Sequence, residues 1–292
     1  MLQNYKTNCF NSQFPMIKCG DHSIKLETPL IMGILNVTPD SFYDGGKYTN
    51  ERTILKRAEI ILSEGADIID IGAYSTRPGA TDVSEGEEYK RMIPAVKAIR
   101  REFPKAILSI DTFRSGIAKQ IVAEFGACII NDISGGTIDD KMFQSIGELK
   151  IPYIMTHIKG TPETMQQNPN YDDLIGEMMS FFEEKITELS NYGVNDVILD
   201  PGFGFGKTLE HNYEIVARLN EFTKLKLPIL TGLSRKSMIC KYLGGMPDTS
   251  LNGTTALNMM CLENGASILR VHDVKEAVEC VKLHNMIKSQ LK

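Results

Sequence analysis

Short apolar runs alternate with longer amphipathic segments from residue 30 to the end of the chain. The runs cover 30–37, 67–72, 106–111, 128–133, 152–157, 196–200, 228–233 and 267–271. Each has the length of one strand and is rich in Ile, Val and Leu without strict polar alternation, which is typical of strands buried on both faces. The pattern therefore predicts eight buried strands.

The segments between these runs have helical periodicity. In 51–66, apolar residues at helical spacing share one face and Gly65 is expected to end the helix. Segments 84–103 and 171–193 behave in the same way. Strands that alternate with helices form parallel βαβ units, and eight such units close a barrel. We expect an α/β fold, a single (β/α)8 TIM barrel, with a doubly wound open sheet as the structural alternative.

Residues 16–26 precede the first barrel strand and have the pattern of a β-hairpin, with Gly20 and Asp21 in its turn. This hairpin is expected to cap the bottom of the barrel. No composition shift or low-complexity linker interrupts the chain. The expected organisation is therefore an N-terminal extension with the β-hairpin over 1–29, followed by one barrel domain over 30–292.

Composition narrows the class of protein. The 292 residues are 42% hydrophobic and 24% charged, which is ordinary for a globular chain, and the net charge of -5 argues against a nucleic-acid partner. No apolar run approaches the roughly 18 residues that span a bilayer, and the N-terminus lacks the apolar segment of a signal peptide. The six cysteines form no CxxC pair. We expect a cytoplasmic protein with reduced thiols and no membrane association.

Polar residues stand at or just after the carboxyl end of every predicted strand, where TIM barrels place their chemistry. In chain order they are Asn36, Ser75 to Arg77, Asp111, Asn131 and Asp132, His157, Asp200, Ser234 to Lys236, and Arg270 with His272. Any one of them could be an ordinary cap or turn residue, but capping does not explain eight polar strand ends. His157 could equally be a core histidine.

The side-chain chemistry of these strand ends falls into two groups. Asp111, Asn131 and Asp200 offer acceptors and an amide donor, which suit a flat heterocycle with amino and ring N–H groups. The cationic or donor side chains suit a phosphate or pyrophosphate. This second group comprises Arg77, Arg235, Lys236, Arg270 and His272. The pattern predicts a ligand with a polar heterocycle at one end and an anion at the other.

Three loops also stand out. Segments 36–46 and 73–80 carry Pro, Gly and aromatic or cationic residues, which suits loops that move over a bound ligand. The stretch DPGFGFGKT (200–208) has the wrong spacing for a Walker A loop or a dinucleotide fingerprint. We expect it to be a tight glycine loop that presents Phe203, Phe205 and Lys207 to the barrel mouth. Motifs for catalytic zinc, serine hydrolysis and calcium sensing are absent from the sequence.

Seven motifs together resemble those of the dihydropteroate synthase family, in that family's order, from about residue 30 to the end. They are MGILNVTPDSF, DIGAYSTRPGA, SIDT, NDISGG, LDPGFGFGKT, GLSRKSMI and RVHDV. The resemblance implies a (β/α)8 barrel that joins 6-hydroxymethyl-7,8-dihydropterin pyrophosphate to para-aminobenzoate, releases pyrophosphate, uses Mg²⁺ and is inhibited by sulfonamides. These small molecules would be its partners, and the family is usually a homodimer through helices near the C-terminus, here 274–287.

The resemblance also assigns roles to residues by motif position. The pterin would be bound by Asp111, Asn131, Met155, Asp200 and Lys236, with Met155 packing on the ring. The pyrophosphate would be held by Asn36, Arg77, Arg270 and His272, with Asn36 as the Mg²⁺ ligand. The aminobenzoate side would be lined by Phe42, Thr76, Pro78, Phe205 and Ser237. The catalytic residues would be Asp44, Thr76, Arg77 and Lys236.

Two other functions compete with this interpretation. A methyltetrahydrofolate:corrinoid methyltransferase barrel shares the Asp-Asn-Asp pterin pocket, but it should not need pyrophosphate-binding residues at the eighth strand. A non-catalytic paralogue that only binds pterin is expected to lose residues from the two loops, whereas Asn36, Thr76 and Arg77 are all present.

Overall fold

The computed structural model describes residues 16–20, 22–37, 47–74, 83–162 and 164–291. The strands are β1 Met16–Cys19, β2 His22–Lys25, β3 Leu30–Asn36, β4 Ile68–Gly72, β5 Ile107–Asp111, β6 Ile129–Asp132, β7 Tyr153–Thr156, β8 Val197–Asp200, β9 Leu230–Thr231 and β10 Ile268–Val271. The helices are α1 Lys47–Ser63, α2 Glu85–Glu102, α3 Ser115–Phe125, α4 Met142–Leu149, α5 Leu174–Asn191, α6 Leu209–Ala217, α7 Ser237–Leu243, α8 Leu251–Glu263 and α9 Val274–Ser289, with 3₁₀ turns at Leu219–Leu225 and Pro247–Thr249.

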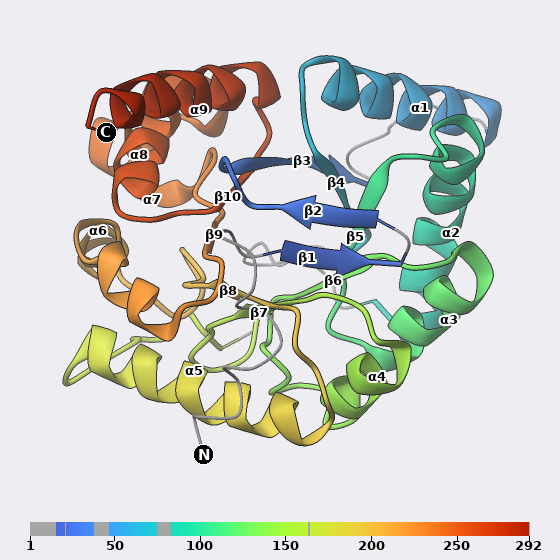
Figure 1. Ribbon diagram of the computed structural model, residues 1–292, viewed down its shortest axis with the longest axis horizontal. Coiled ribbons are helices and arrows are strands. Elements are labelled where there is room, and N and C mark those ends of the chain that lie inside the picture. The colour runs from blue at the N-terminus through green and yellow to red at the C-terminus, as the bar shows by residue number, and fades with distance from the viewer. Residues whose placement is uncertain (1–15, 21, 38–46, 75–82, 163, 292) are drawn as a thin grey trace.

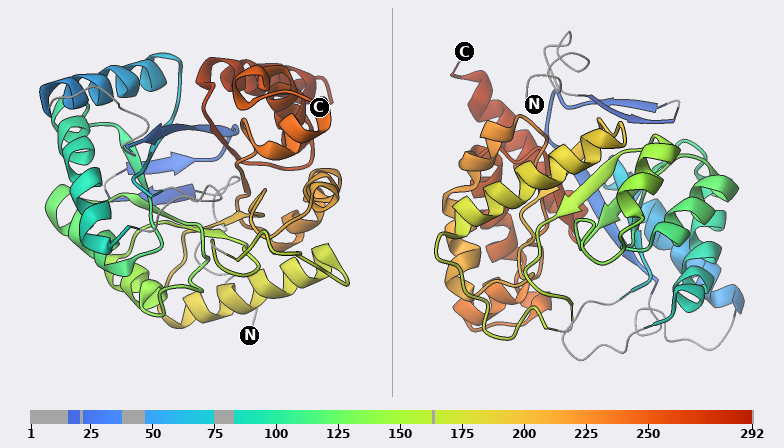
Figure 2. Two further views of the ribbon diagram at one scale, coloured as in Figure 1. Left: turned by 180° about the vertical axis from the view of Figure 1, so that it is seen from behind. Right: turned by 90° about the horizontal axis from the view of Figure 1, so that it is seen from below.

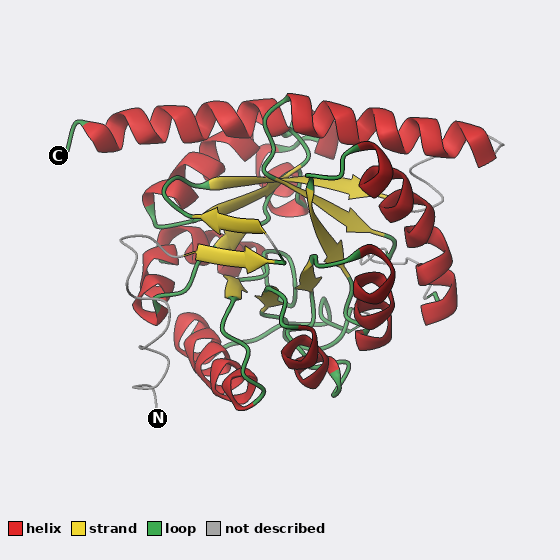
Figure 3. Cartoon of the chain, turned by 45° about the vertical axis from the view of Figure 1, so that its right-hand side comes forward, coloured by secondary structure: helices red, strands yellow, loops and turns green. Residues whose placement is uncertain are grey.

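Eight parallel strands form the barrel, in the order β8-β7-β6-β5-β4-β3-β10-β9. A bridge between Leu199 and Ile229 joins the two ends of this order, and the Leu199 amide donates to the Pro228 carbonyl at 2.9 Å. The ring is thereby nearly closed, with the helices outside it (Figures 1 and 3). The predicted (β/α)8 barrel is confirmed, and the open-sheet alternative is wrong. The seventh strand is shorter than its predicted range because only Leu230 and Thr231 are in ladder geometry.

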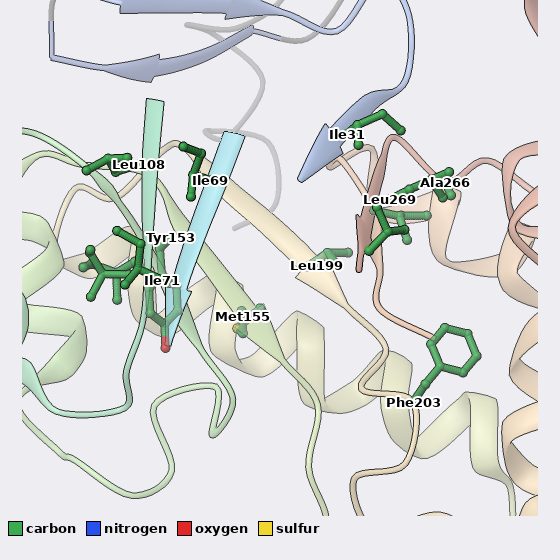
Figure 4. Close-up of a cluster of buried hydrophobic side chains, with 14 of the residues drawn as sticks. Ile31, Ile69, Ile71, Leu108, Tyr153, Met155, Leu199, Phe203, Ala266 and Leu269 are labelled. Atoms are coloured by element: carbon green, nitrogen blue, oxygen red, sulfur yellow. The ribbon is translucent and has the colours of Figure 1, made fainter. Parts of the chain in front are cut away.

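Alternate side chains of each strand point to opposite faces of the sheet, as the two-residue period of a strand requires. One set packs outward against the helices and forms the larger of two hydrophobic clusters, part of which is drawn in Figure 4. The other set points into the barrel. Along β4, for example, Ile69 and Ile71 belong to the outer cluster and Ile68 belongs to the inner one. This alternation decides which strand residues can reach a ligand in the barrel mouth.

The β1–β2 hairpin closes the amino end of the barrel. Ile17 and Cys19 are buried in the same cluster as Met32 and Ile68, which are inward residues near the strand starts. Figures 1 and 2 show the hairpin lying across that end. Its turn residue Gly20 has a φ of +59°, and a Cβ there would lie 2.9 Å from the Cβ of Ala127. The predicted hairpin cap is confirmed, and the carboxyl ends of the strands open at the opposite end.

Local signals place the predicted helices close to their expected ranges. The Ser84 hydroxyl accepts from the Glu87 amide and begins α2, while Asp173 caps α5 in the same way. Gly65, with a φ of +103°, follows the end of α1. Within the described ranges, every helix is too short or too polar to cross a lipid bilayer.

Candidate active site

The inward face of the barrel changes from apolar to polar along the strands. The inward residues of the apolar layer include Ile68, Ile129, Ile154, Ile198 and Ile268. Two positions further along each strand, on the same face, stand Asp70, Asn131, Thr156, Asp200 and Arg270. Because the hairpin covers the apolar layer, the polar layer lies toward the open carboxyl end. The barrel therefore places a layer of polar side chains on a hydrophobic floor.

Arg270, on β10, is the centre of this polar layer. Its Nε donates to Oδ2 of Asp70 at 2.7 Å, and its second guanidinium nitrogen donates to Oδ2 of Asp111 at 2.7 Å. Burial by itself would lower the pKa of Arg270, but the carboxylates of Asp70 and Asp111 outweigh burial and raise it. The guanidinium is therefore a fixed cation held between two carboxylates.

Asp70 was not singled out in the sequence, although the structure places it in the site. Its side chain is fully buried, and the Asn131 amide nitrogen donates to its two oxygens at 3.4 and 3.3 Å. The sequence does carry a signal for Asp70, because it is a carboxylate in the middle of the apolar run DIIDIG (67–72). A buried carboxylate needs a partner, but the sequence does not show that the partner lies 200 residues away.

The two carboxylates expected to bind the heterocycle are both destabilised as anions. Burial raises the pKa of Asp111 to about 7; Arg270 lowers it in part, and the charge of Asp70 raises it further. Burial also raises the pKa of Asp200, against the lowering effect of Lys236. One oxygen of Asp200 accepts from the Gly202 amide at 2.8 Å. Perturbed carboxyl groups that converge on a pocket are typical of functional sites.

Lys236 lies beside these carboxylates, and its ammonium nitrogen is 4.5 Å from the centre of the Phe205 ring. It also donates to the carbonyl of Phe203. Burial lowers the pKa of Lys236 to about 8, although Asp200 partly offsets this effect. The guanidinium of the neighbouring Arg235, which the sequence groups with these cations, is paired with Asp273 and, at 3.2 Å, with Asp248. Unlike the partners of Arg270, these carboxylates lie outside the polar layer, so the structure gives Arg235 no contact with that layer through them.

The glycine loop after β8 departs from expectation at two of three residues. Phe203 is fully buried in the outer cluster (Figure 4). Lys207 is also buried, with 3% of its surface exposed. Its ammonium nitrogen lies 3.0 Å from Nδ1 of His157 and donates to the carbonyls of His157 and Phe205 at 3.1 and 2.9 Å. Only Phe205 is partly exposed at the mouth, and His157 is a core residue that anchors the loop.

Met155 does not occupy the position predicted for it. It is fully buried in the outer cluster, on the same face of β7 as Tyr153, and cannot pack on a ligand inside the barrel (Figure 4). The reason is the two-residue period of the strand: the inward residue at this level is the next one, Thr156. Thr156 pairs in register with Asp200 on β8. Its buried hydroxyl has no hydrogen-bond partner among the described residues.

The remaining described residues of the predicted site lie around the rim. Asn36 ends β3, and its Oδ1 and the Asp111 Oδ2 both border Gly72, at 3.5 and 3.4 Å from where a Cβ would stand. His272 follows β10, its Nδ1 is 3.2 Å from the Ser234 hydroxyl, and burial lowers its pKa to about 4. Ser237 is exposed at the first residue of α7. The other predicted site residues lie outside the described residues: Phe42, Asp44, Thr76, Arg77 and Pro78.

A magnesium ion is compatible with this rim only as a partner of a bound anion. Among the described residues, no three His, Cys, Asp or Glu side chains gather to form a metal site. Asn36 supplies one carboxamide oxygen beside the Asp111 carboxylate. Mg²⁺ usually keeps several waters and binds through one or two protein oxygens together with substrate phosphates. The donor set fits such a shared ion.

Comparisons with known proteins agree with this architecture. The model of a family described as pterin binding enzyme matches residues 32–272. The dihydropteroate synthase of Escherichia coli K12 is 44% identical over 89% of this chain and 92% of its own length. Among solved structures, that of Yersinia pestis dihydropteroate synthase with a sulfonamide drug matches with a TM-score of 0.87 and 40% sequence identity. The match covers 94% of this chain and 99% of that chain.

A third relative bears on the ligand. The Xanthomonas albilineans dihydropteroate synthase in complex with 7,8-dihydropteroate has a TM-score of 0.84 and 32% identity, and the match covers 94% of this chain and 99% of that chain. These matches extend over most of the chain and agree with its fold and with the polar layer at the carboxyl ends of the strands. The chain therefore belongs to the dihydropteroate synthase family of pterin-binding enzymes.

Proposed function

We propose that this protein condenses 6-hydroxymethyl-7,8-dihydropterin pyrophosphate with para-aminobenzoate to give 7,8-dihydropteroate and pyrophosphate. The observation that carries the proposal is the polar layer inside the barrel, where the acceptors Asp111, Asn131 and Asp200 converge with the fixed cation Arg270. The corrinoid methyltransferase alternative explains this cation less well, and the relatives matched over most of the chain are dihydropteroate synthases.

In this proposal, the pterin lies against the acceptor side of the layer. A dihydropterin presents amino and ring N–H donors along one edge, so two carboxylates and a carboxamide can each accept a hydrogen bond from it. Asp111, Asn131 and Asp200 take this role, and Lys236 stands beside them as a donor for a ring acceptor. Thr156 replaces Met155 as the inward residue of β7 in this pocket.

The pyrophosphate lies toward Arg270, His272 and Asn36. Arg270 remains protonated at any physiological pH, and a guanidinium has five N–H donors, so it can donate to phosphate oxygens while Nε and Nη2 stay on their carboxylate partners. His272 is neutral at pH 7, since its pKa is about 4, and it acts as a hydrogen-bond donor or acceptor rather than as a charge. Arg77 belongs to this group by motif position and lies outside the described residues.

Mg²⁺ would be held by Asn36 together with the pyrophosphate itself. Such an ion supplies charge stabilisation to a phosphate leaving group. The chain's own part is to hold the anion at the mouth while the pterin is fixed by hydrogen bonds to the buried carboxylates. The bond that breaks joins the pterin CH₂ carbon to a pyrophosphate oxygen, and the bonding pair leaves with the pyrophosphate.

The aminobenzoate then supplies the electron pair for the new C–N bond and loses one proton. Phe205 and Ser237 border this side of the mouth, and the motif positions add Phe42, Thr76 and Pro78. Asp44 would stabilise positive charge on the pterin methylene, with Thr76 and Arg77 closing over the site. We also propose, from the family, a cytoplasmic homodimer formed through the C-terminal helices.

The decisive test is a pyrophosphate-release assay on the purified protein with Mg²⁺, with each substrate omitted in turn. Release should require the pterin pyrophosphate, should produce 7,8-dihydropteroate only when para-aminobenzoate is present, and should be inhibited by a sulfonamide. Failure to form dihydropteroate with both substrates and Mg²⁺ present would refute the proposal.

A further inference from the structure

The carboxylate of Asp70 links the two halves of the pocket. It is fully buried, it accepts from Arg270 at 2.7 Å on one side, and it accepts from the Asn131 amide nitrogen on the other. Arg270 lies toward the proposed pyrophosphate and Asn131 toward the proposed pterin. Asp70 itself has no exposed surface, whereas its partner Arg270 is partly exposed, so we expect the partners rather than Asp70 to contact the ligands.

The chemistry of a carboxylate fixes which end of the Asn131 amide faces it. An ionised carboxylate only accepts hydrogen bonds, so the amide nitrogen of Asn131 must face Asp70. The amide oxygen is then left as the end available to the pocket. A pterin edge that presents N–H groups needs an acceptor at this point, and a reversed amide would present a donor against a donor.

The same carboxylate fixes the plane of the guanidinium. Nε and Nη2 of Arg270 both reach the same oxygen of Asp70, Oδ2, at 2.7 and 2.6 Å, and Nη2 also donates to Asp111 at 2.7 Å. Charge-assisted contacts to two separate carboxylates restrict the rotation of a planar guanidinium more than one contact would. Arg270 therefore has one orientation in the layer before any ligand binds.

We propose that Asp70 is a positioning residue for the reaction, which orients Asn131 toward the pterin and Arg270 toward the pyrophosphate. The inference rests on the proposed function and deepens it, because it assigns a role to Asp70, the first residue of the motif DIGAYSTRPGA, to which the resemblance gave no role. A substitution of Asp70 should change pterin recognition without changing recognition of para-aminobenzoate, since the hydrogen bonds described for Asp70, Asn131 and Arg270 do not involve Phe205 or Ser237.

The test is Asp70→Asn, with Asp67→Asn as the matched control. Asp67 lies at the opposite end of the same segment, where it accepts from the Ile31 amide at 2.8 Å. In Asp70→Asn the new amide can accept from Arg270 only by turning its NH₂ toward Asn131, which reverses the Asn131 amide. Calorimetry with 6-hydroxymethyl-7,8-dihydropterin should show about tenfold weaker binding, while the KM for para-aminobenzoate stays within about twofold and the control stays at the wild-type value.

A second readout separates positioning from general damage to the fold. Burial raises the pKa of Asp111, the charge of Arg270 lowers it, and the charges of Asp70, Glu88 and Asp132 raise it further. Removing the charge of Asp70 should move the acid limb of pterin binding to lower pH by about half a unit or more. In a protein that already carries Asn131→Ala, adding Asp70→Asn should weaken pterin binding by less than about threefold, because the amide that it misorients is gone.

Some results would overturn the inference. A fall in kcat with unchanged pterin affinity would show only a loss of active protein, and a tenfold loss in both backgrounds would show that Asn131 does not transmit the effect. If Asp70→Asn does not fold, Asp70→Ser is measured in the same way. A wild-type protein that binds the pterin alcohol but makes no dihydropteroate would refute the proposed function while calorimetry still decides the role of Asp70. Absence of pterin binding would refute both.

Discussion

Asp200→Asn should weaken pterin binding without disturbing the glycine loop that follows β8. One oxygen of Asp200 accepts from the Gly202 amide at 2.8 Å, and an asparagine oxygen can accept the same bond. The change is therefore confined to the other oxygen, where an acceptor becomes an NH₂ donor. Because Asp200 is 8% exposed, a mismatched hydrogen bond at this position should cost about 1–3 kcal/mol.

That cost corresponds to roughly 5- to 150-fold weaker binding. The assay is calorimetry with 6-hydroxymethyl-7,8-dihydropterin, together with a thermal melt of each variant. Asp173→Asn is the matched control, since it makes the same substitution at the N-cap of α5, where asparagine caps as well as aspartate. A dissociation constant within twofold of wild type for Asp200→Asn would refute a direct hydrogen bond from Asp200 to the pterin.

Three further predictions follow from the site and its loop. The kcat/KM for the pterin substrate should follow a bell-shaped pH profile: it should rise through about pH 7 as Asp111 ionises and fall above about pH 8 as Lys236 loses its proton. Steady-state kinetics in Asp111→Asn should lack the acid limb, and its persistence would contradict the assignment. Arg270→Ala should weaken the binding of inorganic pyrophosphate more than the binding of the pterin alcohol, as measured by calorimetry. Equal losses of affinity would contradict the division of the site into a pterin side and a pyrophosphate side. Gly202→Ala should lower the thermal midpoint, because Gly202 has a φ of +69° and a Cβ there would lie 2.1 Å from a backbone oxygen of the neighbouring connection. Gly86→Ala in α2, where nothing lies within 4 Å, should leave the midpoint unchanged or raised; equal losses in both glycine variants would argue against the steric reason.

Local patterns along the chain are enough to predict the barrel and much of its chemistry. Eight apolar runs separated by amphipathic segments can bury their surface in few ways, and parallel strands bring their carboxyl ends together. Polar residues that end such runs are consequently neighbours in space. The positions of the strand ends therefore predict that Asp111, Asn131 and Asp200 lie together, and the pattern of residues 16–26 predicts the hairpin at the other end.

The directions of individual side chains and the pairing of their charges depend on how the strands pack together. A one-residue difference in strand phase moves a side chain to the other face, so Thr156 rather than Met155 lies inside the barrel. Pairing between distant segments is equally invisible in the chain. Arg270 pairs with Asp70, 200 residues away in the chain, whereas Arg235, adjacent in sequence to Lys236, pairs with Asp273 outside the polar layer. Local patterns fix elements and their ends, but the balance of charge in a site depends on contacts that form only when the barrel closes.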